Sequence, residues 1–147
     1  EQHTLNYPLH SGDTVRVGSI ICIESIYPEF VVGFVRKGAN VLTVITNDGW
    51  YNYTTGPDQH FWIAAMRAIE NRRYIARSAN TGISGFITPT GEALRKSNID
   101  TQLAMEETLP LIESRTLYVS WGDWVPICTT ILAFFSLLSP LVLFRKK

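Results

Sequence analysis

The sequence predicts an α/β domain followed by a membrane-spanning helix. Two apolar or β-branched runs, 14–22 and 41–46, flank a segment with helical start and stop signals, and a strand, helix, strand order implies a parallel crossover unit. The run from 125 to 144 carries no charged residue, and as a helix it would reach about 30 Å, the thickness of a bilayer's hydrocarbon core. With 147 residues the chain is long enough for one domain with a core.

Each element in the first half of the chain has local signals of its own. The run 14–22 alternates and then becomes continuously apolar, as in a strand that enters a sheet covered on both faces. Pro28 suits the first position of a helix and Gly38 suits a left-handed stop, so we expect a helix over 28–37. The continuous β-branched run 41–46 is typical of a central strand.

The second half continues this pattern before it becomes less regular. After a polar, aromatic loop over 50–56, apolar residues at helical spacing predict a helix from Pro57 to about Arg73. Two further strands are expected at 74–78 and 83–88, and the stretch 95–120 gives only weak extended signals. The predicted organisation is a domain over 1–120, a connector over 121–124, a transmembrane helix over 125–144 and a basic tail over 145–147.

The flanks of the uncharged run support a membrane helix. Trp121 and Trp124 precede it, where indole rings favour a headgroup boundary, and the basic tail follows it, where positive charge favours the cytoplasmic side. The domain would then lie on the outer face of the membrane. A buried helix in a soluble core is the alternative, but such helices seldom run this long without charge.

Composition excludes several classes of function. Thirteen basic residues balance 13 acidic ones without forming a basic stripe, so no nucleic-acid partner is expected. The two cysteines, Cys22 and Cys128, lie far apart and the second is inside the apolar run, so a disulfide is not expected. Because the chain starts at Glu1 and shows no signal-peptide pattern, we expect a fragment or a processed product.

Cys22 is the candidate nucleophile. It stands at the carboxyl end of the first predicted strand, just before a helix, where open α/β sheets place their ligand sites. Backbone N–H groups at a helix start favour a thiolate and can bind an oxyanion. By position alone, however, a packed strand cysteine is an equally good interpretation, since free cysteine is among the most buried residue types.

Five motifs favour the nucleophile. In chain order they are Ile21-Cys22-Ile23-Glu24, Asn47-Asp48-Gly49-Trp50, Gly56-Pro57-Asp58-Gln59-His60, Arg67-Ala68-Ile69-Glu70 and Arg77-Ser78-Ala79-Asn80-Thr81-Gly82-Ile83-Ser84. Together with the tryptophan-flanked apolar run, they resemble the apolipoprotein N-acyltransferase branch of the nitrilase, or carbon-nitrogen hydrolase, superfamily. The resemblance runs from about Val17 to the C-terminus.

The resemblance implies a partial nitrilase-like αββα sandwich followed by one C-terminal transmembrane helix. It implies that Cys22 takes a fatty acyl chain from a phospholipid as a thioester and passes it to the α-amino group of a diacylglyceryl-cysteine on an apolipoprotein, the last step of lipoprotein maturation. The implied location is the bacterial inner membrane, with the domain on the periplasmic face and the C-terminus in the cytoplasm. No metal or other cofactor is implied, because the acyl ester supplies the driving force.

The resemblance also implies which residues support the thiol. Glu24 matches an important acid of the family, whereas Ile23 departs from the family's common tyrosine. In this family a glutamate base and a lysine precede the cysteine. Here no lysine precedes Cys22, and Glu1 is the sole acid before Asp13, so we expect this chain alone to be inactive.

Other residues of the motifs are weaker candidates for a supporting role. Asn47 and Asp48 could order the catalytic loop, although a plain Asx turn explains them as well. His60 could act as a general base, but a structural cap or core hydrogen bond in the first turn of a helix is favoured. Three loop residues have two possible roles: Trp50, Tyr51 and Tyr53. We expect them either to contact acyl chains or headgroups or to pack in an aromatic core.

Two other functions remain open at this point. One is a nitrilase-like amidase that hydrolyses small amides at the membrane, and the other is a non-catalytic, membrane-tethered interaction domain. The anchor favours the acyltransferase, because a two-tailed lipid donor and a membrane-bound acceptor both require a site at the bilayer.

Overall fold

The structure is a computed structural model that describes residues 2–52 and 54–144, with the backbone alone described for 138–144. Its centre is a sheet of six strands in the order β1-β2-β3-β4-β5-β6. The strands are β1 (Thr4–Pro8), β2 (Thr14–Ile21), β3 (Val41–Thr46), β4 (Ile75–Ala79), β5 (Gly85–Ile87) and β6 (Ala93–Lys96). The middle strands β2, β3 and β4 run parallel, and β1, β5 and β6 pair antiparallel at the edges. The predicted α/β class is therefore confirmed.

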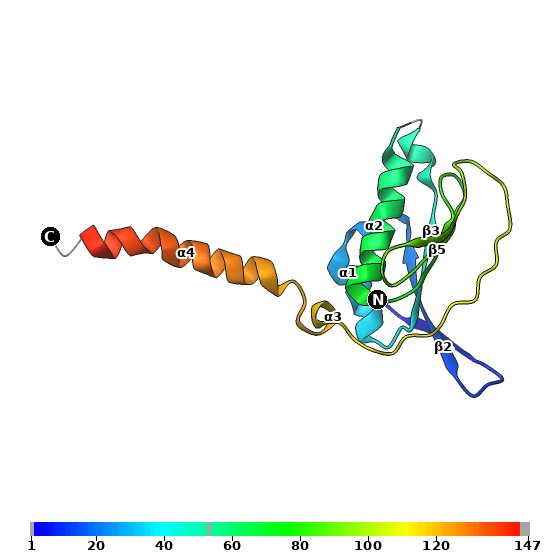
Figure 1. Cartoon of the computed structure of the whole chain (residues 1–147), viewed down its shortest axis with the longest axis horizontal. Coiled ribbons are helices and arrows are strands. Elements are labelled where there is room, and N and C mark those ends of the chain that lie inside the picture. Colours follow the sequence, from blue (N-terminus) through cyan, green and yellow to red (C-terminus); the bar gives the residue numbers. More distant parts are fainter. Residues whose placement is uncertain (1, 53, 145–147) are drawn as a thin grey trace.

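Two helices cover one face of this sheet (Figure 1). Helix α1 (Pro28–Arg36) joins β2 to β3, and α2 (Gly56–Asn71) joins β3 to β4. Because parallel crossovers share one hand, consecutive helices fall on the same face. The helix α1 begins at the predicted proline and ends one residue before the predicted end, ahead of Gly38, whose φ of +97° suits a residue without a Cβ.

One hydrophobic cluster lies between the helices and the sheet. Leu42 and Val44 of β3 and Phe61 of α2 are fully buried in it. Side chains alternate between the two faces of a strand, so Ile45 points the other way, where it and Ile21 of β2 are each 52% exposed. The sheet therefore has one covered face and one open face, which corresponds to one half of the predicted αββα sandwich.

The bounds of α2, β4 and β5 differ from the predictions by one or two residues, and three further segments near the sheet also differ. Strand β2 ends at Ile21, one residue before the predicted end, because the 3-10 helix η1 (Cys22–Ile26) begins at Cys22. A second 3-10 helix, η2 (Asp48–Tyr51), replaces the start of the loop expected from residue 50. The edge strand β1 was not predicted; it pairs antiparallel with β2, with Thr4 opposite Gly18 and Pro8 opposite Thr14.

The segment 97–116 is irregular and ends in a short helix rather than in extended structure. Helix α3 (Leu117–Trp121) is capped by Thr116, whose hydroxyl accepts a hydrogen bond from the N–H of Val119 at 3.0 Å. Val119 is fully buried where α3 meets α1 and α2. This cap and this burial outweigh the strand propensity of the local sequence.

Helix α4 (Trp124–Phe144) coincides with the predicted uncharged run and begins one residue before it. It projects away from the domain (Figure 1). Among the described residues, no helix combines the length and the apolar character that crossing a membrane requires. The predicted basic tail, 145–147, lies outside the described residues.

We expect the stability of the domain to depend on the contact of α2 with the sheet. Replacing the fully buried Phe61 with alanine should lower the free energy of unfolding by about 3–5 kcal/mol, through lost burial and a residual cavity. Met66 lies on the same helix and is half exposed. Met66→Ala should therefore change the free energy of unfolding by about 0.5 kcal/mol or less. Urea unfolding followed by circular dichroism measures both values, and equal effects would contradict this packing.

Candidate active site

Cys22 lies on a sharp turn where β2 gives way to η1. Its φ is +48°, a left-handed conformation that residues other than glycine seldom adopt and that clusters at functional sites. Two contacts hold the turn. The Glu24 carboxylate accepts a hydrogen bond from the N–H of Ile21 at 2.7 Å, and the Ser25 hydroxyl donates to the carbonyl oxygen of Cys22 at 2.9 Å. The thiol itself is only partly buried.

The sulfur of Cys22 contacts the neighbouring parallel strand. Ile21 pairs with Ile45, so the next residues, Cys22 and Thr46, meet at the carboxyl edge of the sheet. The Thr46 hydroxyl lies 3.3 Å from the sulfur and 2.9 Å from Oδ1 of Asp48. The thiol is therefore joined through one hydroxyl to a buried carboxylate.

Asp48 forms an ion pair with Arg77 in the interior of the domain. The two side chains are 0% exposed, and the guanidinium donates to Oδ2 at 2.7 Å. Burial alone would raise the pKa of Asp48, but the His60 hydrogen bond, the Arg77 charge and the Thr46 hydrogen bond together lower it below its ordinary value. Burial lowers the pKa of Arg77, while Asp48 acts in the opposite direction. The carboxylate at this position is therefore a stable anion.

His60, near the start of α2, completes a chain of buried contacts. Its Nδ1 donates to Oδ1 of Asp48 at 2.8 Å, because an ionised carboxylate can only accept. Its Nε2 lies 2.8 Å from the Ser25 hydroxyl, the same hydroxyl that reaches the carbonyl oxygen of Cys22. The ring also packs edge-on against Tyr51, with 5.9 Å between ring centroids. The imidazole is thus placed to support the Cys22 turn from within.

The structure brings only some of the predicted site residues together. Cys22, Asp48 and His60 belong to one hydrogen-bonded group, and Glu24 holds the turn beside it. Asn47 lies outside this group: its Oδ1 accepts from the N–H of Gly49 at 3.2 Å and from the Thr81 hydroxyl at 2.5 Å.

The predicted aromatic loop residues have different surroundings. Trp50 is 85% exposed, which rules out the core packing that was one of its two expected roles. Tyr51 lies against His60. Tyr53 lies outside the described residues.

Sequence reasoning missed two members of this group and underrated a third. Thr46 was assigned only as the last residue of a strand, and Ser25 was not considered. Arg77 was expected to form an ion pair, although its partner was not foreseen. The one signal that could have found Thr46 and Arg77 is their place near the carboxyl ends of two neighbouring parallel strands.

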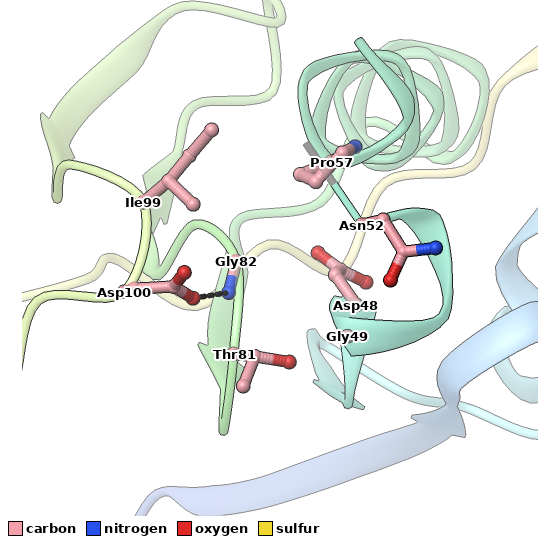
Figure 2. A pocket seen from close by; sticks show the side chains of 8 residues that line it. All are labelled: Asp48, Gly49, Asn52, Pro57, Thr81, Gly82, Ile99 and Asp100. Atoms are coloured by element: carbon pink, nitrogen blue, oxygen red, sulfur yellow. Dashed lines mark hydrogen bonds between the residues drawn. The ribbon is translucent and has the colours of Figure 1, made fainter. Parts of the chain in front are cut away.

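A pocket of about 170 Å³ lies beside Asp48 rather than over the sulfur. Figure 2 shows Asp48, Asn52 and Thr81 around it, with Asp100 accepting a hydrogen bond from the N–H of Gly82 at 3.3 Å. Its volume is below the range typical of drug-sized ligand sites, so it does not hold a two-tailed lipid. Among the described residues, no group of three or more acidic, histidine or cysteine side chains is arranged to hold a metal ion.

Comparison with known proteins identifies the fold and the family. Residues 2–107 match the carbon-nitrogen hydrolase family. The chain belongs to this family. Solved structures with the same fold include an amidase from Nesterenkonia sp. AN1 with acrylamide added at its active-site cysteine (22% identity, TM-score 0.52, 67% of this chain and 40% of that one). Another is Saccharomyces cerevisiae Nit3 (21% identity, TM-score 0.53, 67% of this chain and 38% of that one).

Curated relatives of this carbon-nitrogen hydrolase are named apolipoprotein N-acyltransferase. The protein of Chlorobaculum tepidum is 39% identical over 95% of this chain and 26% of its own length. That of Thermotoga maritima is 36% identical over 85% of this chain and 25% of its own length. The chain therefore spans about a quarter of the length of these relatives.

We expect Asp48→Asn to destabilise the domain in a pH-dependent way. At neutral pH the substitution leaves the buried Arg77 without its counter-ion, which should lower the free energy of unfolding by about 3–5 kcal/mol. The stabilisation from the Asp48 carboxylate is fully present above its ordinary pKa of 3.8 and is lost as the pH falls from there through the lowered folded value. The difference in free energy of unfolding between the variant and the wild type should therefore be smaller at about pH 3 than at neutral pH.

Urea unfolding at both pH values measures this difference. Glu106→Gln provides the matched control, because Glu106 is exposed and its charge should contribute little at either pH. A difference between Asp48→Asn and the wild type that stays constant with pH would contradict the assignment of Asp48 as a buried anion.

Proposed function

We propose that this chain is the cysteine-bearing part of an apolipoprotein N-acyltransferase. The single observation that carries the proposal is the placement of Cys22, on a left-handed turn at the carboxyl edge of the parallel strands and hydrogen-bonded to Thr46. A nucleophile needs this combination of a fixed position and a partly open side chain. The relatives named apolipoprotein N-acyltransferase support an apolipoprotein as the acceptor.

In the proposed reaction, the Cys22 thiolate attacks the ester carbonyl carbon of a phospholipid. A thioester forms, and the lysophospholipid leaves as an alcohol after it takes up a proton. The α-amino group of a diacylglyceryl-cysteine on an apolipoprotein then attacks the thioester and gives up a proton to a base, an amide forms, and the sulfur leaves as a thiolate. Glu24 supports these steps as a positioning residue, because its carboxylate holds the turn that carries the thiol.

Protonation of the leaving alkoxide requires a general acid, and deprotonation of the attacking amine requires a general base. The family resemblance implies a glutamate and a lysine that precede the cysteine. No lysine precedes Cys22 in this sequence. We therefore propose that the 147-residue chain alone does not catalyse the reaction. An enzyme as long as the curated relatives does.

We also propose that α4 anchors the domain in the bacterial inner membrane. The run 125–144 has no charged residue, and Ile127, Leu132 and Phe135 expose their side chains along α4, a surface that is more stable in lipid than in water. In this proposal, residues 1–120 form part of the catalytic domain on the periplasmic face. Residues 121–124 lie at the interface, and 145–147 form a cytoplasmic tail.

Intact-mass analysis after exposure to phospholipid tests the acyl transfer. For an enzyme as long as the curated relatives, we expect a fatty-acyl mass adduct that maps to Cys22. The adduct should disappear in Cys22→Ala but persist in Cys128→Ala. The 147-residue chain should give no turnover. An enzyme without an adduct that turns over a soluble amide would favour the amidase, and one with neither activity would favour the interaction domain.

Flotation with phospholipid vesicles tests the anchor. The whole chain should float with vesicles of phosphatidylethanolamine and phosphatidylglycerol and should stay bound through an alkaline wash, since apolar burial is insensitive to charge. A chain that ends at residue 123 should remain in the dense fraction. Equal flotation of both chains would contradict the anchor.

A further inference from the structure

We propose that the Thr46 hydroxyl is a hydrogen-bond donor that follows the charge on the Cys22 sulfur. It donates to Asp48 when the sulfur is neutral and turns to the sulfur when the sulfur is anionic. Thr46 is thus a positioning and charge-stabilising residue for the nucleophile. The inference rests on the proposed function, in which Cys22 is that nucleophile.

The Thr46 hydroxyl faces two acceptors with one proton. Its oxygen lies 2.9 Å from Oδ1 of Asp48 and 3.3 Å from the sulfur of Cys22. A hydroxyl donates once, so both contacts cannot be donations at the same time. While the thiol is neutral, the carboxylate is the stronger acceptor, because hydrogen bonds to ionised groups are the strong ones. The thiol can then donate its own proton to the Thr46 oxygen.

Asp48 has two other donors besides Thr46. Its Oδ1 also accepts from Nδ1 of His60 at 2.8 Å, and its Oδ2 accepts from the Arg77 guanidinium at 2.7 Å. When the hydroxyl turns away, the carboxylate keeps both of these donors. A newly formed thiolate gains a charge-assisted donor in exchange, so the rotation favours the ionised sulfur.

The backbone around Thr46 is fixed, so only the side chain needs to turn. The carbonyl oxygen of Thr46 accepts a hydrogen bond from the N–H of Asn80 at 2.9 Å, and Thr46 pairs in register with Ala79 of β4. The residue is almost fully buried, which limits competition from water for the hydroxyl. Rotation about one side-chain bond is therefore the local motion that this proposal requires.

The same donor serves both halves of the proposed reaction. It stabilises the sulfur as the attacking thiolate, and later as the thiolate that leaves when an amine attacks the thioester. The sulfur of the intervening thioester carries no charge, so the hydroxyl returns to Asp48 in that state.

Alkylation of Cys22 by iodoacetamide tests the proposal without any lipid. The thiolate displaces iodide from the reagent, and the thiol proton passes to the buffer. The whole chain is used in detergent micelles with Cys128→Ser, so that Cys22 is the one remaining thiol. The alkylation rate is measured from neutral to alkaline pH for the wild type and for Thr46→Val, Thr46→Ala and Thr46→Ser.

We expect Thr46→Val and Thr46→Ala to move the midpoint of the pH–rate profile upward by about one pH unit, which slows alkylation about ten-fold at neutral pH. The rate at the alkaline plateau should be unchanged, because the fully ionised sulfur is present in each variant. Thr46→Ser keeps the donor and should restore the wild-type midpoint. Thr43→Val is the matched control, since Thr43 lies on the same strand and its hydroxyl contacts Ser19 at 3.0 Å.

Two results would overturn the proposal. One is a Thr46→Val profile that superimposes on that of the wild type. The other is a lower plateau with an unchanged midpoint, which would assign Thr46 a purely structural role in holding the turn. Absence of a Cys22 acyl adduct in the enzyme would reject the proposed function instead, and the alkylation result would still decide the role of Thr46.

Discussion

The buried ion pair between Asp48 and Arg77 is the constraint on which the site depends. Removing two charges from water is costly, and the cost is offset only when the geometry is close and further hydrogen bonds complete the pair. Here Thr46 and His60 supply hydrogen bonds to Asp48, and the carbonyl oxygen of Ile83 accepts from Nε of Arg77 at 3.0 Å. Nη1 of Arg77 is buried without a hydrogen-bond partner among the described residues. A single carboxylate therefore fixes the ends of two parallel strands and the start of α2 relative to one another.

This arrangement holds Cys22, the proposed nucleophile, from two sides. Thr46 reaches the sulfur of Cys22 from one side, and His60 reaches its carbonyl oxygen through Ser25 from the other. The left-handed backbone at Cys22 is costly by itself and persists only where its surroundings determine it. The buried charge pair supplies those surroundings, which links the stability of the domain to the geometry of the thiol.

The connection to the C-terminal helix is built from polar contacts on the helix layer. Arg36 of α1 donates to the carbonyl oxygen of Val119 at 2.7 Å, and the Thr116 hydroxyl donates to the carbonyl oxygen of Glu70 in α2 at 2.6 Å. Helix α3 is thereby fixed to the ends of both helices that cover the sheet. Helix α4 follows α3 after a short turn, so its start lies next to the layer that packs against the sheet.

The sequence by itself determined the elements whose signals are local. Strand β3 has the predicted bounds and α1 differs by one residue, because a β-branched run, a helix-starting proline and a left-handed glycine act within a few positions. The five motifs also identified the family. The tertiary structure alone decided how the site is assembled, since Thr46 is 24 residues from Cys22 and Arg77 is 29 from Asp48. Contacts of this kind depend on strand register and side-chain direction, which no local pattern specifies.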